Sequence, residues 1–454
     1  MRDLLLLASL LYLVPVAIVR PWVGVLGWFW VSYFVPHSFT WGFGRRLPVA
    51  ALIGGATLIG FVFERDRKPL PGTLSVLLMA LFGVHMTITS MLAFNPELSW
   101  MKWNWVAKGF LMTFVTMCLF QDPSRLRTLY MVPAICLGLW GLKSALYVVR
   151  TGGGSRVFGP EFSFFGDNNE FGLAVSMAIP LMLYLSRDEK RVWMKRFLRL
   201  LFAASIVAVL FTYSRGAFLA LTTVLGILIW RSPWRLRFGA AVLVVACVAV
   251  PLAPQGLKDR IASIRDQESA KTRDGSVAGR IEAWTTSWRI ATAHPFAGEG
   301  FRALWNDEIW NEYFGYNYLV VRDVHSLYFE VMSEHGFVGF FIYMAIMISA
   351  LATLASVRAR WKGHPEYGYL SYYAEMNQLA IYPFMVAGAF LSFAYFDLYF
   401  LLVATSSILK VLSVQAELAV AGAAPVGTLP VGITPRELMS RRSGNPPQPR
   451  PNHA

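Results

Sequence analysis

The sequence predicts an all-α polytopic membrane protein. Of its 454 residues, 56% are hydrophobic and only 15% are charged, well below the roughly 25% charged residues of soluble domains. Apolar runs close to the about 20 residues that a helix needs to cross a bilayer follow one another along the chain. The 16 Trp, 18 Tyr and 33 Phe suit long membrane–water interfaces. These observations exclude a soluble multidomain protein.

Thirteen apolar segments are candidate spans. In chain order they cover residues 4–19, 22–36, 48–63, 74–95, 103–120, 128–149, 170–186, 196–213, 216–230, 238–252, 326–356, 376–396 and 398–413. Pro15 and Pro21 interrupt the first two, which form either two spans or one span and an interfacial helix. The sequence therefore predicts about twelve spans, or thirteen. The first run imitates a signal peptide but has no convincing cleavage site, so we expect it to be retained.

Basic loops set the expected orientation. They are "ERDRK" at 64–68, "SRLR" at 124–127, "RDEKRVWMKRFLR" at 187–199, "RSPWRLR" at 231–237 and "RARWK" at 358–362. Loops rich in Lys and Arg face the cytoplasm, and an even number of spans separates each of these loops from the next. The net charge of +14 fits this pattern and is weak evidence for nucleic-acid binding.

The orientation divides the chain into four parts and defines an outer face. The parts are N-terminal transmembrane helices over 1–252, an outer loop over 253–324, C-terminal transmembrane helices over 325–422, and a Pro- and Gly-rich tail over 423–454 that we expect to be disordered and cytoplasmic. The other outer segments are 37–47, 96–102, 150–169 and 213–215.

One segment of the outer loop, "GRIEAWTTSWRIATAHP" at 279–295, predicts a helix that ends at His294–Pro295. Ile281, Trp284, Trp288 and Ala291 form its expected apolar face, and Arg280, Glu282 and Arg289 fall on other faces. We expect this helix to lie on the membrane surface or to cap a cavity.

Arg215 lies in "YSRG", between two apolar runs. It is either an interfacial arginine that snorkels to water or part of a phosphate site. Other arginines share the outer segments, namely Arg45, Arg46, Arg156, Arg280, Arg289, Arg302 and Arg322. Because guanidinium groups bind phosphate bidentately and keep their charge, this grouping favours phosphate recognition for Arg215.

Two histidines follow in "RDVHSLYFEVMSEHGFVG", 322–339. His325 opens a long span beside the arginine-rich face, and its ordinary pKa suits a general base at neutral pH. Asp323 and Glu330 are near in sequence, but spacing alone does not make them its partners. We expect His335, ten residues deeper, to serve helix packing together with Gly336 and Gly339.

Residues 156–181 form a third polar feature. Arg156 and the cluster Asp167, Asn168 and Asn169 directly precede a span. These side chains either cap the helix or supply hydrogen bonds to sugar or phosphate, and both interpretations stand.

Several motifs are absent from the sequence. It has no Walker P-loop, no HExxH, no GxSxG, no Cys/His cluster and no outer DxD pair. Cys118, Cys136 and Cys247 all lie in apolar runs, which indicates buried thiols without disulfides. We therefore expect no metal and no cofactor. The spans show few acidic residues, which disfavours a proton-coupled transporter.

The order of three motifs resembles the O-antigen ligase/polymerase superfamily. They are "SRGAFLAL" at 214–221, "GRIEAWTTSWRIATAHPFAGEGF" at 279–301 and "HSLYFEVMSEHGFVG" at 325–339. The N-terminal run to residue 43 is similar to the branch of exosortase-associated O-glycosylation ligases.

The resemblance implies a GT-C-like bundle of about twelve helices in the bacterial inner membrane, with a periplasmic helical loop. The implied donor is a glycan on undecaprenyl diphosphate. The acceptor is the lipid A-core oligosaccharide in ligases, another lipid-linked repeat in polymerases, and potentially a protein in the O-glycosylation branch. Catalytic roles carry over to Arg215, Arg280 and His325.

The resemblance and the grouping of outer arginines supply four expected substrate-binding residues, Arg156, Asn169, Arg289 and Arg45. Ser326 stands where the family usually has Asn, which puts any role of that amide in doubt. A lipid-linked glycan flippase is the competing function of another class. It would need outer arginines too, but no base, and charge through both halves of the membrane.

Overall fold

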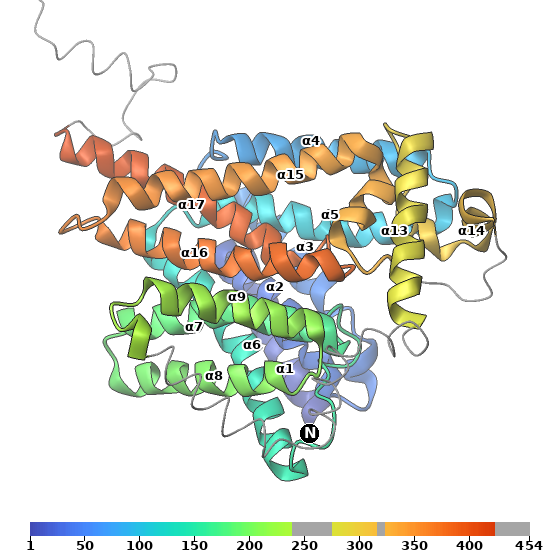
Figure 1. Ribbon diagram of the computed structural model, residues 1–454. Helices are drawn as coiled ribbons and strands as arrows, with labels where there is room; N and C mark the ends of the chain where they lie inside the picture. The colour runs from blue at the N-terminus through green and yellow to red at the C-terminus, as the bar shows by residue number, and fades with distance from the viewer. Residues whose placement is uncertain (238–274, 316–322, 423–454) are drawn as a thin grey trace, which may run out of the picture.

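A computed structural model describes residues 1–237, 275–315 and 323–422. The predicted span at 238–252, the loop segments 253–274 and 316–322, and the tail 423–454 lie outside these residues. Every regular element in the described residues is helical (Figure 1). The prediction of an all-α protein is therefore confirmed for this part of the chain.

The long helices run roughly alongside one another, and one crosses their ends (Figure 1). The first nine are α1 (Arg2–Val19), α2 (Pro21–Phe34), α3 (Val49–Phe63), α4 (Leu74–Met91), α5 (Pro96–Leu119), α6 (Pro123–Thr151), α7 (Asn168–Asp188), α8 (Val192–Leu210) and α9 (Arg215–Arg231). Then follow α13 (Gly275–Ala293), α14 (Asp307–Phe314), α15 (Leu327–Trp361), α16 (Gly368–Ala387) and α17 (Asp397–Val420), with short 3-10 turns at Pro36–Phe39, Phe43–Arg46, Ala303–Trp305 and Gly388–Phe390.

Each predicted span within the described residues overlaps a helix. Pro21 begins α2 directly after a break at Arg20, so the first two segments are separate helices, whereas Pro15 lies inside α1. By length and composition, six described helices can cross a membrane: α1, α4, α6, α7, α15 and α17. The total of about twelve spans stays a prediction.

The prediction for 376–396 is wrong at its end. The helix α16 stops at Ala387, and residues 388–396 form a 3-10 turn followed by an irregular segment. This segment supplies polar contacts to the site described below, which a continuous helix would not offer.

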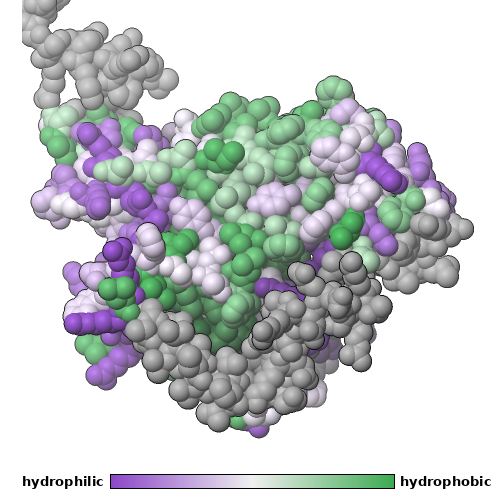
Figure 2. All heavy atoms as spheres, in the orientation of Figure 1, coloured by the Kyte–Doolittle hydropathy of each residue, from purple (hydrophilic) through white to green (hydrophobic). Residues whose placement is uncertain are grey.

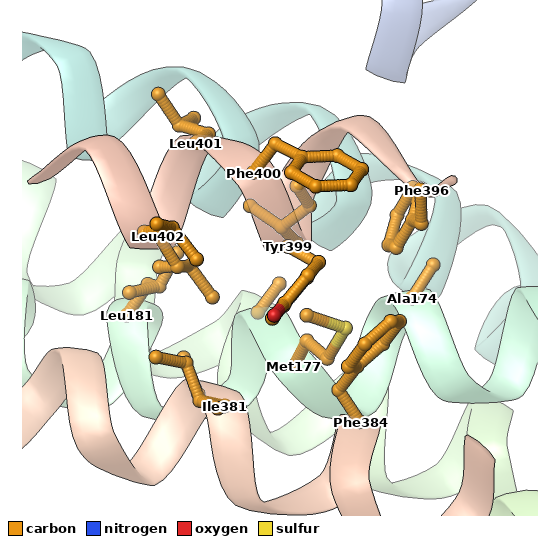
Figure 3. Close-up of a cluster of buried hydrophobic side chains, with 14 of the residues drawn as sticks. Ala174, Met177, Leu181, Ile381, Phe384, Phe396, Tyr399, Phe400, Leu401 and Leu402 are labelled. Carbon is orange, nitrogen blue, oxygen red and sulfur yellow. The ribbon is translucent and has the colours of Figure 1, made fainter. Parts of the chain in front are cut away.

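The core lies between α7, α16 and α17. Figure 3 shows Met177 and Leu181 of α7 facing Ile381 and Phe384 of α16 and Tyr399 of α17. All five side chains have no solvent exposure, and the rings of Phe384 and Tyr399 stack at 4.5 Å. This packing holds α16 and α17, and therefore the segment between them, in a fixed position.

The two ends of the bundle differ from its middle. Figure 2 shows hydrophobic residues over the middle of the helices and hydrophilic residues toward the ends. At one end, predicted cytoplasmic loops meet: Arg127 pairs with Glu189 at 2.7 Å, and Arg231 pairs with Glu375 of α16 at 2.8 Å. The first pair confirms that the loops 124–127 and 187–199 share an end, while the compartment that this end faces stays a prediction.

The predicted outer segments meet at the opposite end. The backbone N–H of Val157 donates to the carbonyl of Phe211 at 3.0 Å, and that of Phe94 donates to the carbonyl of Glu299 at 3.1 Å. The helix α13 crosses this end (Figure 1). We call it the α13 end.

A break inside α15 joins the outer loop to the bundle. Gly336 has φ +65° and ψ −172°, which interrupts the helix. Three backbone hydrogen bonds connect the break to residues 295–300: Glu299 N–H to Ser333 O at 2.9 Å, Gly300 N–H to Glu334 O at 3.0 Å, and Val338 N–H to Pro295 O at 3.3 Å. The loop therefore satisfies carbonyls that the break would otherwise leave buried without partners.

The predicted apolar face of α13 is right only in part. Ala291 is buried and Trp284 packs against the core beneath the helix, but Ile281 and Trp288 are 56% and 52% exposed, and Ala283 and Ile290 are buried instead. Small side chains such as Ala283 and Ala291 allow the helix to pack closely. Beneath it lies a separate small core that includes Leu304, Ile309, Trp310 and Val324.

Candidate active site at the α13 end

His325 lies directly before α15 in a strained backbone conformation. Its φ is +53°, in the left-handed region that residues other than glycine and asparagine rarely adopt. The N–H of His325 donates to Oγ of Ser392 at 2.7 Å. Strain of this kind is concentrated at functional sites, where the surrounding structure holds the residue in place.

Trp284 places α13 against His325. Its indole Nε1 donates to the carbonyl of Val324 at 3.0 Å, and its ring stacks on Phe329 at 5.5 Å. Arg280 precedes Trp284 by four residues, so the two lie on the same face of the helix. The expectation that Arg280 falls on another face is therefore wrong, and this face brings the guanidinium toward His325.

Electrostatics at His325 reflect these neighbours. Burial lowers the pKa of His325 below its ordinary value of 6.5, and the positive charge of Arg280 lowers it further. The carboxylates of Asp323 and Asp167 act in the opposite direction. His325 therefore holds its imidazole neutral at pH 7, the form that accepts a proton.

Arg215 is the first residue of α9 and is partly buried. The Oγ of Ser214 caps this helix by accepting the N–H of Ala217 at 3.1 Å. A cation at a helix N-terminus opposes the helix dipole, whereas an anion there is stabilised. The position of Arg215 therefore suits anion binding better than helix stability.

The start of α9 lies beside the segment that holds His325. A side chain at Gly216 would contact Leu391 at 3.8 Å, and Leu391 precedes the Ser392 that accepts the His325 N–H. These contacts connect Arg215 and His325 through the segment 388–396.

The polar cluster before α7 contacts the segment that precedes Arg215. Asp167 caps α7 by accepting the N–H of Asn169 at 2.8 Å, and the amide of Asn169 also points to Asp167, at 2.6 Å. Buried Asn168 donates to the carbonyl of Thr212 at 2.8 Å. The helix-capping interpretation thus holds for Asp167, while Asn168 ties α7 to the segment before Arg215.

The remaining predicted binding residues occupy different surroundings. Arg156 is exposed, one residue before the Val157 hydrogen bond to Phe211. Arg45 pairs with Glu161 at 3.4 Å and lies over the Phe162 ring at 4.1 Å.

Arg289 donates to the carbonyl of Tyr313 at 2.7 Å, so its guanidinium fastens α13 to α14. Arg322 lies outside the described residues.

A cavity of about 450 Å³ lies next to the segment before α15 and is lined by Asp323 and Val324, the two residues that precede His325. Its lining includes Lys102, Trp105, Phe164, Glu170, Arg302, Trp305, Asp323, Glu330, Glu334 and Ser392. Asp323 and Ser392 contribute to both the cavity and the surroundings of His325. The cavity therefore adjoins His325 through these two residues, while His325 itself is not among its lining residues.

A buried hydrogen-bond network supports the cavity floor. Glu334 accepts the N–H of Arg302 at 2.7 Å and the hydroxyl of Tyr395. That hydroxyl also contacts Nε2 of His335 at 2.8 Å, and Nδ1 of His335 contacts Oγ1 of Thr89 at 2.7 Å. His335 is fully buried. This arrangement agrees with the predicted packing role of His335.

Three acidic side chains lie within the helices near this end. Glu330 and Glu334 are 7% and 4% exposed, and Asp397 accepts the hydroxyl of Ser32 at 2.7 Å. The α13 end of the bundle thus has more buried acidic side chains than the sequence predicted for the spans.

Comparison with protein families covers two stretches of the chain. Residues 200–344 match the family described as O-antigen ligase, and this stretch contains Arg215, Arg280 and His325. This match supports the resemblance to the O-antigen ligase superfamily. Residues 1–190 match a family of unknown function. No curated protein matches the chain.

The match over residues 200–344 supports ligase- or polymerase-type function in general. Together with the apolar helices, it indicates a multi-pass membrane protein. The resemblance to the superfamily is therefore confirmed, while the branch of O-glycosylation ligases stays a prediction.

Sequence reasoning missed most of the cavity. Glu330 and Glu334 are four residues apart on one helix, a spacing that places both on one face and that was readable in the sequence. Lys102, Arg302 and Tyr395 come from three distant segments, and no local pattern connects them.

Proposed function

We propose that this protein is a glycosyltransferase of the O-antigen ligase superfamily. It transfers a glycan from undecaprenyl diphosphate to the lipid A-core oligosaccharide at the periplasmic face of the bacterial inner membrane. Two observations support the proposal, both within the stretch that matches O-antigen ligase. Arg280 is near enough to lower the pKa of His325, and the start of α9, where Arg215 lies, is next to Leu391 of the segment that holds His325.

The proposed chemistry is a single displacement at the anomeric carbon. Neutral His325 takes the proton of the acceptor hydroxyl as its oxygen forms the new glycosidic bond. The bond between the anomeric carbon and the diphosphate oxygen breaks, and the electron pair leaves with the diphosphate. The configuration at the anomeric carbon is therefore inverted.

Arg215 and Arg280 stabilise the charge that grows on the leaving diphosphate. A divalent metal plays this part in other transferases. Fixed guanidinium groups keep their charge at every physiological pH and bind phosphate in a planar fork. The diphosphate is already a good leaving group, so the scheme needs neither a metal nor a general acid.

Transfer in EDTA tests the chemistry. Purified protein receives lipid-linked glycan and acceptor, with and without excess EDTA, and the product is resolved by gel. We expect equal transfer under both conditions and an inverted anomeric linkage by NMR. Loss of transfer that only a divalent metal restores would contradict the metal-free scheme.

A deletion strain separates ligase from polymerase. A strain without a ligase accumulates full-length glycan on undecaprenyl diphosphate, and a strain without a polymerase accumulates single repeats. We expect full-length glycan. Mass spectrometry of the surface glycoconjugates then identifies the acceptor, because the class that loses its glycan, lipid A-core or protein, is the one that received it.

A further inference from the structure

The cavity beside His325 has the dimensions of a small-molecule site. Its volume of about 450 Å³ falls within the roughly 300–1,000 Å³ range of such sites. Residues of the outer loop, of α5, α7 and α15, and of segment 388–396 all line it. A site built from so many segments has a fixed shape, which favours recognition of one ligand class.

Aromatic rings form part of the cavity wall. Trp305 is held in place because its Nε1 donates to Oδ1 of Asp323 at 2.9 Å and the guanidinium of Arg302 lies over its ring at 4.5 Å. Trp105 and Phe164 lie against each other at 5.5 Å. Fixed aromatic surfaces suit the C–H faces of sugar rings, which are apolar although the ring edges carry hydroxyls.

Carboxyl groups supply the polar part of the wall. Glu330 Oε2 accepts the N–H of Ala394 at 3.0 Å, while Oε1 has no hydrogen bond from any described residue. Asp323 lies exposed at the same cavity. Since a carboxyl group hydrogen-bonds a hydroxyl in either protonation state, and an ionised one repels anions, the wall favours hydroxyl groups over acidic groups.

The cavity differs in charge from the surroundings of Arg215 and Arg280. Four carboxyl groups line the cavity, against two cations, and both cations are already engaged with aromatic rings. Arg302 lies over Trp305 at 4.5 Å, and the Lys102 ammonium lies 5.1 Å from the Trp105 ring centroid and 5.5 Å from that of Tyr395. A diphosphate is therefore better placed at Arg215 and Arg280 than inside the cavity.

From these observations we infer that the cavity binds the acceptor sugar, and that it selects a ring without acidic groups. The inference rests on the proposed function, because it assigns one of the two substrates of that reaction. Ser392 and Asp323 line the cavity and flank His325, so a sugar held by Trp305, Asp323 and Glu330 presents a hydroxyl to the imidazole.

Saturation-transfer NMR tests the binding without any transfer reaction. The probes are methyl β-D-glucopyranoside and methyl β-D-glucuronide, added separately to the detergent-solubilised full chain. We expect saturation transfer to the ring protons of the glucoside but not the glucuronide. Trp305→Ala should weaken the glucoside signal by about tenfold, the order expected for loss of an aromatic contact.

Two variants act as controls. Trp288→Ala removes an indole of α13 that is 52% exposed, against 41% for Trp305, and that lies outside the cavity; this variant should bind the glucoside as the wild type does. Asp323→Asn keeps an oxygen for the Trp305 indole but removes the charge, and it should admit the glucuronide. Glucoside binding that Trp305→Ala leaves unchanged, or equal binding of both probes by the wild type, overturns the inference.

Kinetics separate this inference from the proposed function. In the transfer reaction, Trp305→Ala should raise the KM for the acceptor and leave the KM for the lipid-linked donor unchanged. Sugar binding by a wild-type protein that performs no transfer would contradict only the proposed function. Transfer with an unchanged acceptor KM in Trp305→Ala would contradict only the assignment of the cavity.

Discussion

The backbone N–H of His325 donates a 2.7 Å hydrogen bond to Oγ of Ser392, and the same residue has φ +53°. The bond joins the start of α15 to the irregular segment between α16 and α17. The imidazole is therefore positioned by two parts of the chain that are 67 residues apart.

Ser392→Ala should lower kcat for transfer by about twofold to tenfold, because loss of one hydrogen bond costs about 0.5–1.5 kcal/mol and frees the backbone at His325. Donor affinity should change little, since the Ser392 hydroxyl bonds to the backbone of His325. Ser392→Thr keeps the hydroxyl and should restore most of the rate. An alanine variant with wild-type kcat would show that the bond does not position the base.

Arg215→Lys distinguishes phosphate recognition from snorkelling. Lysine keeps the charge but loses the planar fork, and a charge-assisted contact contributes about 1.5–3 kcal/mol. Transfer should therefore fall roughly tenfold to hundredfold in Arg215→Lys and be nearly abolished in Arg215→Ala, at normal membrane abundance. Wild-type transfer in the lysine variant would support the snorkelling interpretation, because lysine snorkels as well.

His325→Ala should differ in kind from the arginine variants. The base acts on the acceptor hydroxyl, so the variant should still bind the lipid-linked donor while turnover is lost. Donor binding is measured with the purified variant by native mass spectrometry, and turnover by glycan transfer. If donor binding disappears together with turnover, His325 has a different part in the site.

The pH dependence of transfer should report the pKa of His325. Burial and Arg280 lower this pKa, so the neutral base persists and the acid limb of kcat/KM has its midpoint below the ordinary value of about 6.5. Arg280→Met removes a positive neighbour and should move the midpoint upward. Asp323→Asn removes a negative neighbour and should move it downward.

The lowered pKa of His325 also determines how the free energy of unfolding changes with pH. The unfolded chain takes up the proton first as pH falls through about 6.5, so the stability contributed by neutral His325 is present above that pH. It is lost as pH falls toward the lower pKa of the folded state. If Arg280→Met and Asp323→Asn shifted the midpoint of the acid limb of kcat/KM in the same direction, the assignment of that limb to His325 would be contradicted.

Gly298→Ala should destabilise the α13 end severely. Gly298 has φ +58°, and an added Cβ would lie 2.5 Å from the carbonyl oxygen of Ser333. Gly315 has φ +87° but open space around it, so Gly315→Ala isolates the backbone cost of about 1–2 kcal/mol. Thermal unfolding in detergent should show a larger loss for Gly298→Ala. Equal losses would mean that the loop yields to the added methyl group.

Much of the fold could be predicted because apolar runs of membrane length mark helices whatever their neighbours are. The face of α13 could be predicted only in part, because its packing uses Ala283 as well as the predicted Ala291 and leaves Trp288 exposed. The end of α16 at Ala387 was also missed, since the following segment remains apolar although its backbone is irregular.

Within the candidate site, charge next to apolar runs was the informative signal. This signal identified Arg215 and His325, because placing an ionisable side chain in such surroundings costs free energy and therefore indicates a function. The cavity gave no such signal, because Lys102, Arg302 and Trp305 lie in outer segments where polar residues are ordinary. Their arrangement follows from the tertiary structure alone.

The three backbone hydrogen bonds between residues 295–300 and the break at Gly336 have a consequence for chimeric proteins. Because main-chain atoms form this joint, the loop and the helix have to be exchanged as one cassette. A graft of residues 275–315 from a relative needs residues 330–339 from the same parent. Otherwise the carbonyls of Ser333 and Glu334 lose their donors inside the bundle. Engineering of substrate specificity through the outer loop therefore has to include residues 330–339 of α15.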